Sequence, residues 1–252
     1  MDVIESATTG RRLARELGLS SDVVIGPRDL PTIADPRGAV DEALASPLDF
    51  PPLAAAIAPG DCAAIALARG VPCATQIATG AVRSLREAGV DPDRITVVLQ
   101  AHSELQRRLV EALEQDGHDE VRVELHDPGD ETATAMVGVT AAGRALRINR
   151  TLADADVVLP ISAAGPAAAR KNLASKFDAL RPAFSDTETQ RRFRSRAGIS
   201  TATKLKENCD EADEAGWLMG VAISIHAAPG PENTLLGVFA GEPAAASSAA
   251  AE

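Results

Sequence analysis

The chain has 252 residues, 45% of them apolar, a length and composition that predict one large domain with a full core and exclude extensive disorder. A formal net charge of −11 and an aromatic content of 2% argue against nucleic-acid binding, because polyanions need a positive field and single strands need stacking platforms. Three cysteines without paired spacing, no leader-like segment and no membrane-length apolar run predict a soluble, cytoplasmic protein without a membrane partner.

The first sixty residues are expected to form short, separate elements. An amphipathic helix is predicted around residues 11–17, and a short strand at 22–27, where "DVVIGP" ends in a Gly-Pro turn. Residues 39–47 are typical of a helix that ends at Pro47. Residues 49–61 have prolines near the start and Pro-Gly at the end, which favours a second, apolar helix.

A regular alternation of strands and helices begins at residue 62. Continuous apolar runs predict strands at 62–68, 94–101 and 121–126. Helical periodicity between them predicts helices at 74–90 and 103–117. Strand, helix, strand, helix, strand at this spacing is typical of a parallel sheet with right-handed crossovers, so we expect an α/β fold.

The second half is less regular. Residues 144–162 predict two more strands around a short helical turn, and residues 165–198 have helical character. Two apolar stretches, 217–230 and 234–243, are expected to pair as a hairpin around "PGPEN". The alanine-rich end from residue 244 is of low complexity. We therefore expect one domain over residues 1–246 and a frayed tail at 247–252.

Polar side chains follow the three predicted parallel strands. Arg69 comes after the first strand, His102 after the second, and "VRVELHDPGD" places His126 and Asp127 at the end of the third. Ligands bind beyond the carboxyl ends of parallel strands, where arginine can hold a carboxylate and histidine can move a proton. Each residue taken alone is more often a polar strand cap. If the strands are neighbours, Arg69, His102 and His126 converge on one edge of the sheet, and a small-acid site is predicted there.

Three further stretches each have more than one interpretation. "AAGP" (163–166) is either an anion-binding helix start or a plain turn. Lys171 and Lys176 are either phosphate contacts or nucleophiles, or they are solvated lysines. "RRFRSR" (191–196) either docks a phosphate-bearing ligand, neutralises an acidic face, or is solvated.

Several stretches together resemble one family, the nickel-dependent lactate racemases. They are "ALASPLDFPPLAAAIAPGDCAAIAL" (43–67), "AGVDPDRITVVLQAH" (88–102), "ELHDPGD" (124–130), "VGVTAAGRALRINRTLADADVVLPIS" (137–162) and "LMGVAISIHAAPGPENTLLGVFAGEPAAA" (218–246). The resemblance implies a parallel-sheet, Rossmann-like N-terminal domain of the lactate racemase type, with a small C-terminal β-hairpin segment. It also implies racemisation or epimerisation of a small 2-hydroxy acid by hydride and proton transfer at C2.

The resemblance assigns roles to individual residues. His102 matches the first of two catalytic histidines, and His126 lies in the family's His-Asp segment as a further catalytic or pocket-shaping residue. In the family a nickel-pincer nucleotide tethered to a lysine accepts the hydride. Lys176 is the closest match to that lysine, Lys171 is the fallback, and Arg69 stands near the family's cofactor-site arginine.

The chain also departs from the family pattern. After the first strand the sequence reads "ARGVPC", where the family has Asp-x-x-Arg-Pro, and the family's Pro-His falls at Pro166-Ala167. The nickel-ligand histidine would fall near Arg192, no histidine lies between residues 127 and 225, and no other metal site is predicted. The chain stops where the resemblance places the family's C-terminal domain.

Three hypotheses follow, and the sequence leaves it open whether the chain is an enzyme. The first is a 2-hydroxy-acid racemase that uses His102 as a base, together with a partner chain or as a homo-oligomer. The second is a non-catalytic homologue that lost the nickel-pincer site and acts as a ligand-binding or scaffold protein. The third is a phosphate-binding enzyme that uses the arginines of residues 191–196.

Overall fold

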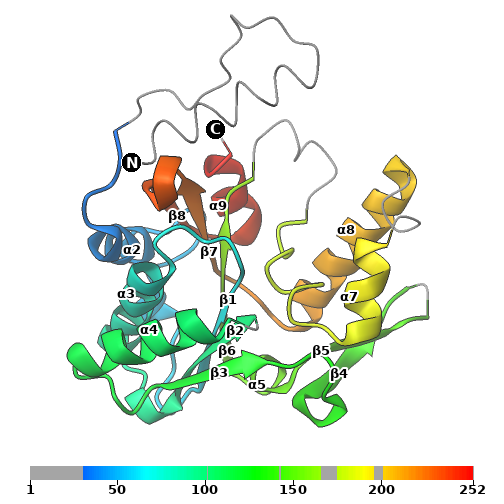
Figure 1. The fold of residues 1–252 in the computed structure, drawn as a ribbon, viewed down its shortest axis with the longest axis horizontal. Coiled ribbons are helices and arrows are strands. Elements are labelled where there is room, and N and C mark those ends of the chain that lie inside the picture. Colours follow the sequence, from blue (N-terminus) through cyan, green and yellow to red (C-terminus); the bar gives the residue numbers. More distant parts are fainter. Residues whose placement is uncertain (1–30, 101, 142, 166–174, 196–200, 252) are drawn as a thin grey trace, which may run out of the picture.

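A mostly parallel six-stranded sheet forms the centre of the molecule (Figure 1). In the computed structural model, residues 31–100, 102–141, 143–165, 175–195 and 201–251 are described. The strand order is β3-β2-β1-β6-β7-β8, and only β8 runs antiparallel to its neighbour. The strands are β1 Ala63–Leu67, β2 Ile95–Gln100, β3 Arg122–His126, β6 Val157–Ala163, β7 Ser224–Pro229 and β8 Leu235–Gly241. The predicted α/β fold with a parallel sheet is confirmed.

The remaining elements surround this sheet (Figure 1). A separate antiparallel hairpin pairs β4 Thr134–Val139 with β5 Ala145–Asn149, where the resemblance placed the family's hairpin. The helices are α2 Pro36–Ala45, α3 Ala74–Glu87, α4 Ser103–Gln115, α5 Arg150–Ala153, α7 Thr187–Arg194, α8 Ala202–Leu218 and α9 Pro243–Ala249. Within the residues described, no helix is both long and apolar enough to cross a membrane.

Both faces of the sheet are covered, which explains why its central strands are apolar throughout. All five residues of β1 are buried, as expected of a parallel strand between two layers. Ile65 and Leu67 pack into the core that lies under α2, α3 and α4. Ala64 and Ala66 face the opposite core, which contains Phe184 and other residues of the 177–184 segment. The small alanines leave room for this segment to lie close to the sheet.

The free edge of β8 is covered by the N-terminal part of the chain. The Leu48 amide donates to the Ala240 carbonyl at 2.8 Å, and the Ile33 amide donates to the Leu235 carbonyl at 2.7 Å. Gly241, with φ of 151°, lies against the Leu48 backbone, and a Cβ atom there would be 2.2 Å from the Leu48 carbonyl oxygen. Only glycine allows this approach.

Three sequence predictions are wrong, each for a local reason. Residues 49–61 do not form a helix: only the 3-10 turn Leu53–Ala55 forms, because Pro52 is extended and Leu53 is the one buried side chain of the stretch. The strand predicted from residue 217 starts at Ser224 instead, since 217 and 218 end α8.

The alanine-rich end is not frayed up to residue 249, because it forms α9. Pro243 begins this helix, the Glu242 carboxylate caps it by accepting from two backbone amides, and Ala246 is fully buried. The helix predicted around residues 11–17 and the strand predicted at 22–27 lie outside the described residues.

Candidate functional site

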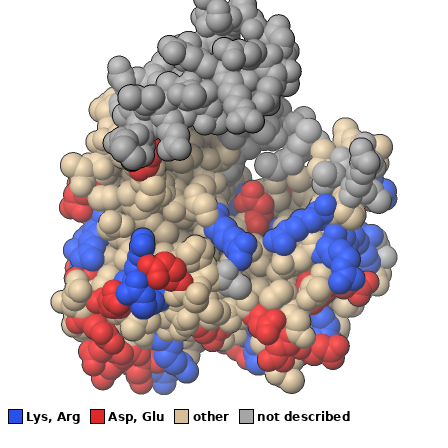
Figure 2. Space-filling model, in the orientation of Figure 1, with Lys and Arg blue, Asp and Glu red and all other residues tan. Residues whose placement is uncertain are grey.

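A cavity of about 650 Å³ opens beyond the carboxyl ends of β1 and β2, and we call it the rim cavity. Leu67 and Leu99 are register partners in these two parallel strands, so the residues that follow both strands reach the same edge. Arg69 and His102 both line the cavity, as the strand order predicts. On the face shown in Figure 2, acidic and basic side chains are interspersed over the described surface.

The first turn of α3 gives the rim cavity an anion-binding character. Ala74, Thr75 and Gln76 line the cavity, and the N-cap residue Cys73 makes no side-chain hydrogen bond to their amides. Uncapped amides and the positive end of the helix dipole favour a bound anion. Burial raises the pKa of the Cys73 thiol, so this cysteine stays protonated rather than acting as a thiolate.

Charged side chains add to this character. Arg69 and Arg108 line the cavity, and Arg108 Nε contacts the exposed Glu104 carboxylate at 2.8 Å. The Arg69 backbone amide donates to Gln100 Oε1 at 2.9 Å, which fixes the turn that carries the arginine. The cavity therefore combines two arginines with one carboxylate at the start of a helix, an arrangement suited to a carboxylate ligand.

His102 has a structural role that limits its chemistry. It is the N-cap of α4, and its Nδ1 accepts a hydrogen bond from the Leu105 amide at 3.0 Å. A neutral ring that accepts at Nδ1 carries its hydrogen on Nε2, so it presents a donor. To remove a proton from a ligand, this histidine has to give up the cap or rotate.

His126 does not line the rim cavity, although it ends the neighbouring strand. It is 2% exposed, its Nε2–H donates to the Ser185 carbonyl at 2.9 Å, and its ring packs against Phe184. Burial lowers the pKa of His126, and the hydrogen bond to Ser185 only partly opposes this. Asp127 accepts from the Gly129 amide at 2.8 Å and so closes the turn after the strand.

Gln100, at the end of β2, also holds the segment that His126 contacts, and this role was not predicted from the sequence. It is the register partner of His126, lines the rim cavity, and donates from Nε2 to the Ala183 carbonyl at 3.0 Å. Gln100 and His126, which we call the rim clamp, thus attach the 183–185 segment to the ends of two adjacent strands. The only sequence signal was a polar residue at the end of an apolar strand.

Lys176 is not among the described residues that line the rim cavity. Lys176 Nζ lies 3.7 Å from the Glu242 carboxylate and 5.4 Å from the centre of the Phe177 ring. Lys171 lies outside the described residues.

A buried carboxylate organises the arginine-rich region, which sequence reasoning also missed. Glu211 is 3% exposed, and its Oε1 accepts from Arg181 Nε at 2.9 Å and from Arg192. Its Oε2 accepts from Arg144 at 2.8 Å. Burial on its own raises the pKa of Glu211, but the hydrogen bonds from Arg192 and Arg181 outweigh burial and lower it. We call Glu211 and these three arginines the Glu211 cluster.

Comparison with known proteins decides the family. The model of the lactate racemase N-terminal domain matches residues 14–164, more than half of the chain. The chain belongs to this family.

Solved structures support the same fold. Seven chains match, among them the lactate racemase apoprotein from Thermoanaerobacterium thermosaccharolyticum, with a TM-score of 0.69 and 13% sequence identity. The match covers 88% of this chain and 55% of that one, so this chain spans about half the length of the solved racemase. A search of curated proteins found no match.

The nickel of the pincer nucleotide that the resemblance implies would need a side-chain ligand such as an imidazole. The resemblance places the family's nickel-ligand histidine near Arg192, whose guanidinium donates to Glu211 and has no lone pair to offer a metal. His126 and His226 are buried and hydrogen-bonded to neighbouring residues. Within the described ranges, no group of three or more His, Cys, Asp or Glu residues is placed to hold a metal ion.

Proposed function

We propose that this chain binds a small 2-hydroxy acid in the rim cavity. The observation that carries the proposal is the convergence of Arg69, His102 and the uncapped first turn of α3 on one cavity. The ligand carboxylate lies between Arg69 and the α3 amides, where both positive groups stabilise it. His102 donates its Nε2–H to the ligand hydroxyl oxygen or to the carboxylate.

If the chain isomerises its ligand at C2, His102 is the residue that moves the hydroxyl proton. This step requires the imidazole to leave the Leu105 amide, because a ring that accepts there has no lone pair at Nε2. His126 takes no direct part in this step, since it does not line the cavity.

Binding is tested by isothermal titration calorimetry with D- and L-lactate and with larger 2-hydroxy acids. We expect Arg69→Met to weaken binding at least about tenfold, because a charge-assisted hydrogen bond contributes roughly 1.5–3 kcal/mol. Lys206→Met is the control, since Lys206 is exposed on α8, pairs with Asp210 and does not line the rim cavity. Equal affinity of the wild type and Arg69→Met for every acid would refute the proposal.

The second candidate is a binding protein without catalysis, and the Glu211 cluster favours it. Arg192, near which the resemblance places the family's nickel ligand, is engaged with a buried carboxylate. The two candidates are separated by expressing the protein together with a cofactor-synthesis pathway, then measuring intact mass, nickel content and exchange of the C2 hydrogen of lactate. A covalent adduct on Lys176 with C2 exchange supports the isomerase, and binding without adduct or exchange supports the non-catalytic protein.

A further inference from the structure

A second cavity, of about 460 Å³, lies at the other end of α3 from the rim cavity. We call it the distal cavity. Arg83 and Arg86 line it from the later turns of α3, Arg37 from the first turn of α2, and Asp116 and His118 from the end of α4 and the loop that follows. The two cavities have no lining residue in common. The two cavities are therefore distinct sites.

His118 is fixed within this cavity before any ligand arrives. It is 9% exposed, its amide donates to the Leu113 carbonyl at 2.8 Å, and its carbonyl accepts from the Val121 amide at 3.1 Å. Arg86 Nη1 lies 2.6 Å from His118 Nδ1, and because a guanidinium only donates, Nδ1 is the acceptor.

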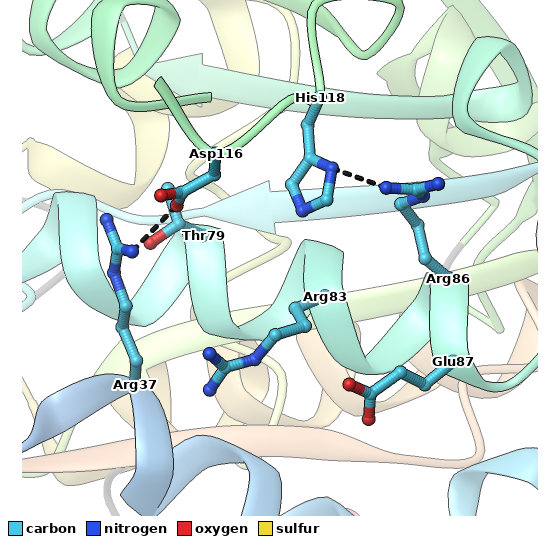
Figure 3. Close-up of a pocket in the computed structure, with 7 residues that line it drawn as sticks. All are labelled: Arg37, Thr79, Arg83, Arg86, Glu87, Asp116 and His118. Carbon is cyan, nitrogen blue, oxygen red and sulfur yellow. Dashed lines mark hydrogen bonds and ion pairs between the residues drawn. The ribbon is translucent and has the colours of Figure 1, made fainter. Parts of the chain in front are cut away.

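The ring of His118 therefore has its hydrogen on Nε2. Figure 3 shows this second ring nitrogen turned away from Arg86 and into the cavity. No described residue is hydrogen-bonded to it. A buried donor without a partner is costly, so this N–H is suited to an acceptor supplied by a ligand.

The arginines supply more donors than the protein uses. Arg37 Nη1 contacts Asp116 at 2.7 Å, Arg83 Nη2 contacts Asp41, and Arg86 contacts His118. Each guanidinium carries five N–H groups, and each of these three arginines uses one nitrogen for its contact with a described residue. Three arginines and two carboxylates line the cavity, and a third carboxylate, that of Asp41, contacts Arg83 from outside the lining.

We propose that the distal cavity binds a phosphate group, with His118 Nε2–H and the free N–H groups of Arg83 and Arg86 as donors. A phosphate offers several acceptor oxygens and matches the planar fork of arginine. The cavity is larger than one phosphate ion, so the group arrives either as free phosphate or as a phosphate monoester. Two ligands separate these sources: inorganic phosphate and glycerol phosphate.

The test combines calorimetry with histidine-ring NMR on the full chain. We expect saturable phosphate binding with Kd at or below about 1 mM, weakened at least about tenfold by Arg86→Met. Arg107→Met removes the same charge from an exposed site and should change Kd less than about twofold. The chain has four histidines, so His118→Gln assigns the ring signal that phosphate should shift. Tighter binding of glycerol phosphate identifies a monoester, and equal binding identifies the free ion.

Three results would overturn the proposal. They are no saturable binding at millimolar phosphate, a loss of affinity as large in Arg107→Met as in Arg86→Met, and binding removed by Arg69→Met, which would place the anion in the rim cavity. Because Arg86 is exposed, the Arg86→Met variant should fold, and the NMR titration of the wild type gives an independent result.

Discussion

Replacing Glu211 by Gln should be among the most destabilising single changes in this protein. Glutamine keeps the shape of the side chain, but it removes the charge and turns one acceptor into an N–H donor among guanidinium donors. Arg181, which is 1% exposed, then stays buried without its counter-charge. Breaking a buried ion pair costs about 3–5 kcal/mol, which is a large share of the roughly 5–15 kcal/mol that stabilises a typical domain.

The other two arginines of the Glu211 cluster change this expected loss of stability little. Arg144 and Arg192 are 43% and 32% exposed, so water screens them once the carboxylate is gone. Arg181 keeps weaker hydrogen bonds to the Arg147 carbonyl and to the Ser185 hydroxyl, which limits the loss. Burial lowers the pKa of Arg181 against the opposing effect of Glu211, but the guanidinium remains charged.

Urea unfolding followed by circular dichroism measures the effect. Asp210→Asn is the matched control on the same helix, because Asp210 and Lys206 are exposed and water screens their ion pair. The double variant Arg181→Met with Glu211→Met should be more stable than Glu211→Gln, since it leaves no unpaired charge. A loss below about 1 kcal/mol in Glu211→Gln, or a double variant no better than the single one, would refute the reasoning.

Three further predictions concern the rim cavity and its supports. His102→Ala should lower stability by about 0.5–2 kcal/mol, because the cap of α4 is lost. His102→Asn should keep the cap while it removes the imidazole. Thermal unfolding of the two variants measures the difference. Because its pKa is lowered by burial, His126 stabilises the fold fully above about pH 6.5, and this contribution should be lost as the pH falls toward its folded pKa; His126→Gln should flatten the pH dependence of urea unfolding in that window. Gln100→Leu should lower the free energy of unfolding by about 1–3 kcal/mol and weaken 2-hydroxy-acid binding, because the Arg69 amide and the Ala183 carbonyl both lose a partner. Unchanged lactate affinity would show that the rim clamp does not position Arg69.

The sheet could be predicted from sequence because its strands are continuous apolar runs with clear breaks. The runs at 62–68, 94–101 and 121–126 became β1, β2 and β3, and their adjacency brought Arg69 and His102 to one cavity. Helix α3 ends at Glu87, and Gly89, with φ of 105°, follows it as the pattern indicates.

Contacts between distant segments could not be predicted in this way. Nothing in the sequence around Glu211 indicates that three arginines, between 19 and 67 residues away, converge on its carboxylate. The direction of a side chain at a strand end is equally hidden. His126 and Gln100 are register partners, yet only Gln100 lines the rim cavity. Residues 49–61 have helix start and stop signals at their ends, but they lack the row of buried apolar side chains that stabilises a helix through packing.

The covered edge of β8 has a consequence for how the protein behaves at high concentration. An open strand edge presents unpaired amides and carbonyls to any other chain, and it is a template for aggregation. Here the contacts of Ile33 and Leu48 occupy backbone groups of β8 that a second molecule would otherwise pair with. The segment around Leu48 can pair with β8 only because residue 241 has no side chain. Gly241→Ala should therefore push the 48–50 segment away from β8 and raise the tendency to self-associate, visible as light scattering, before the core itself unfolds.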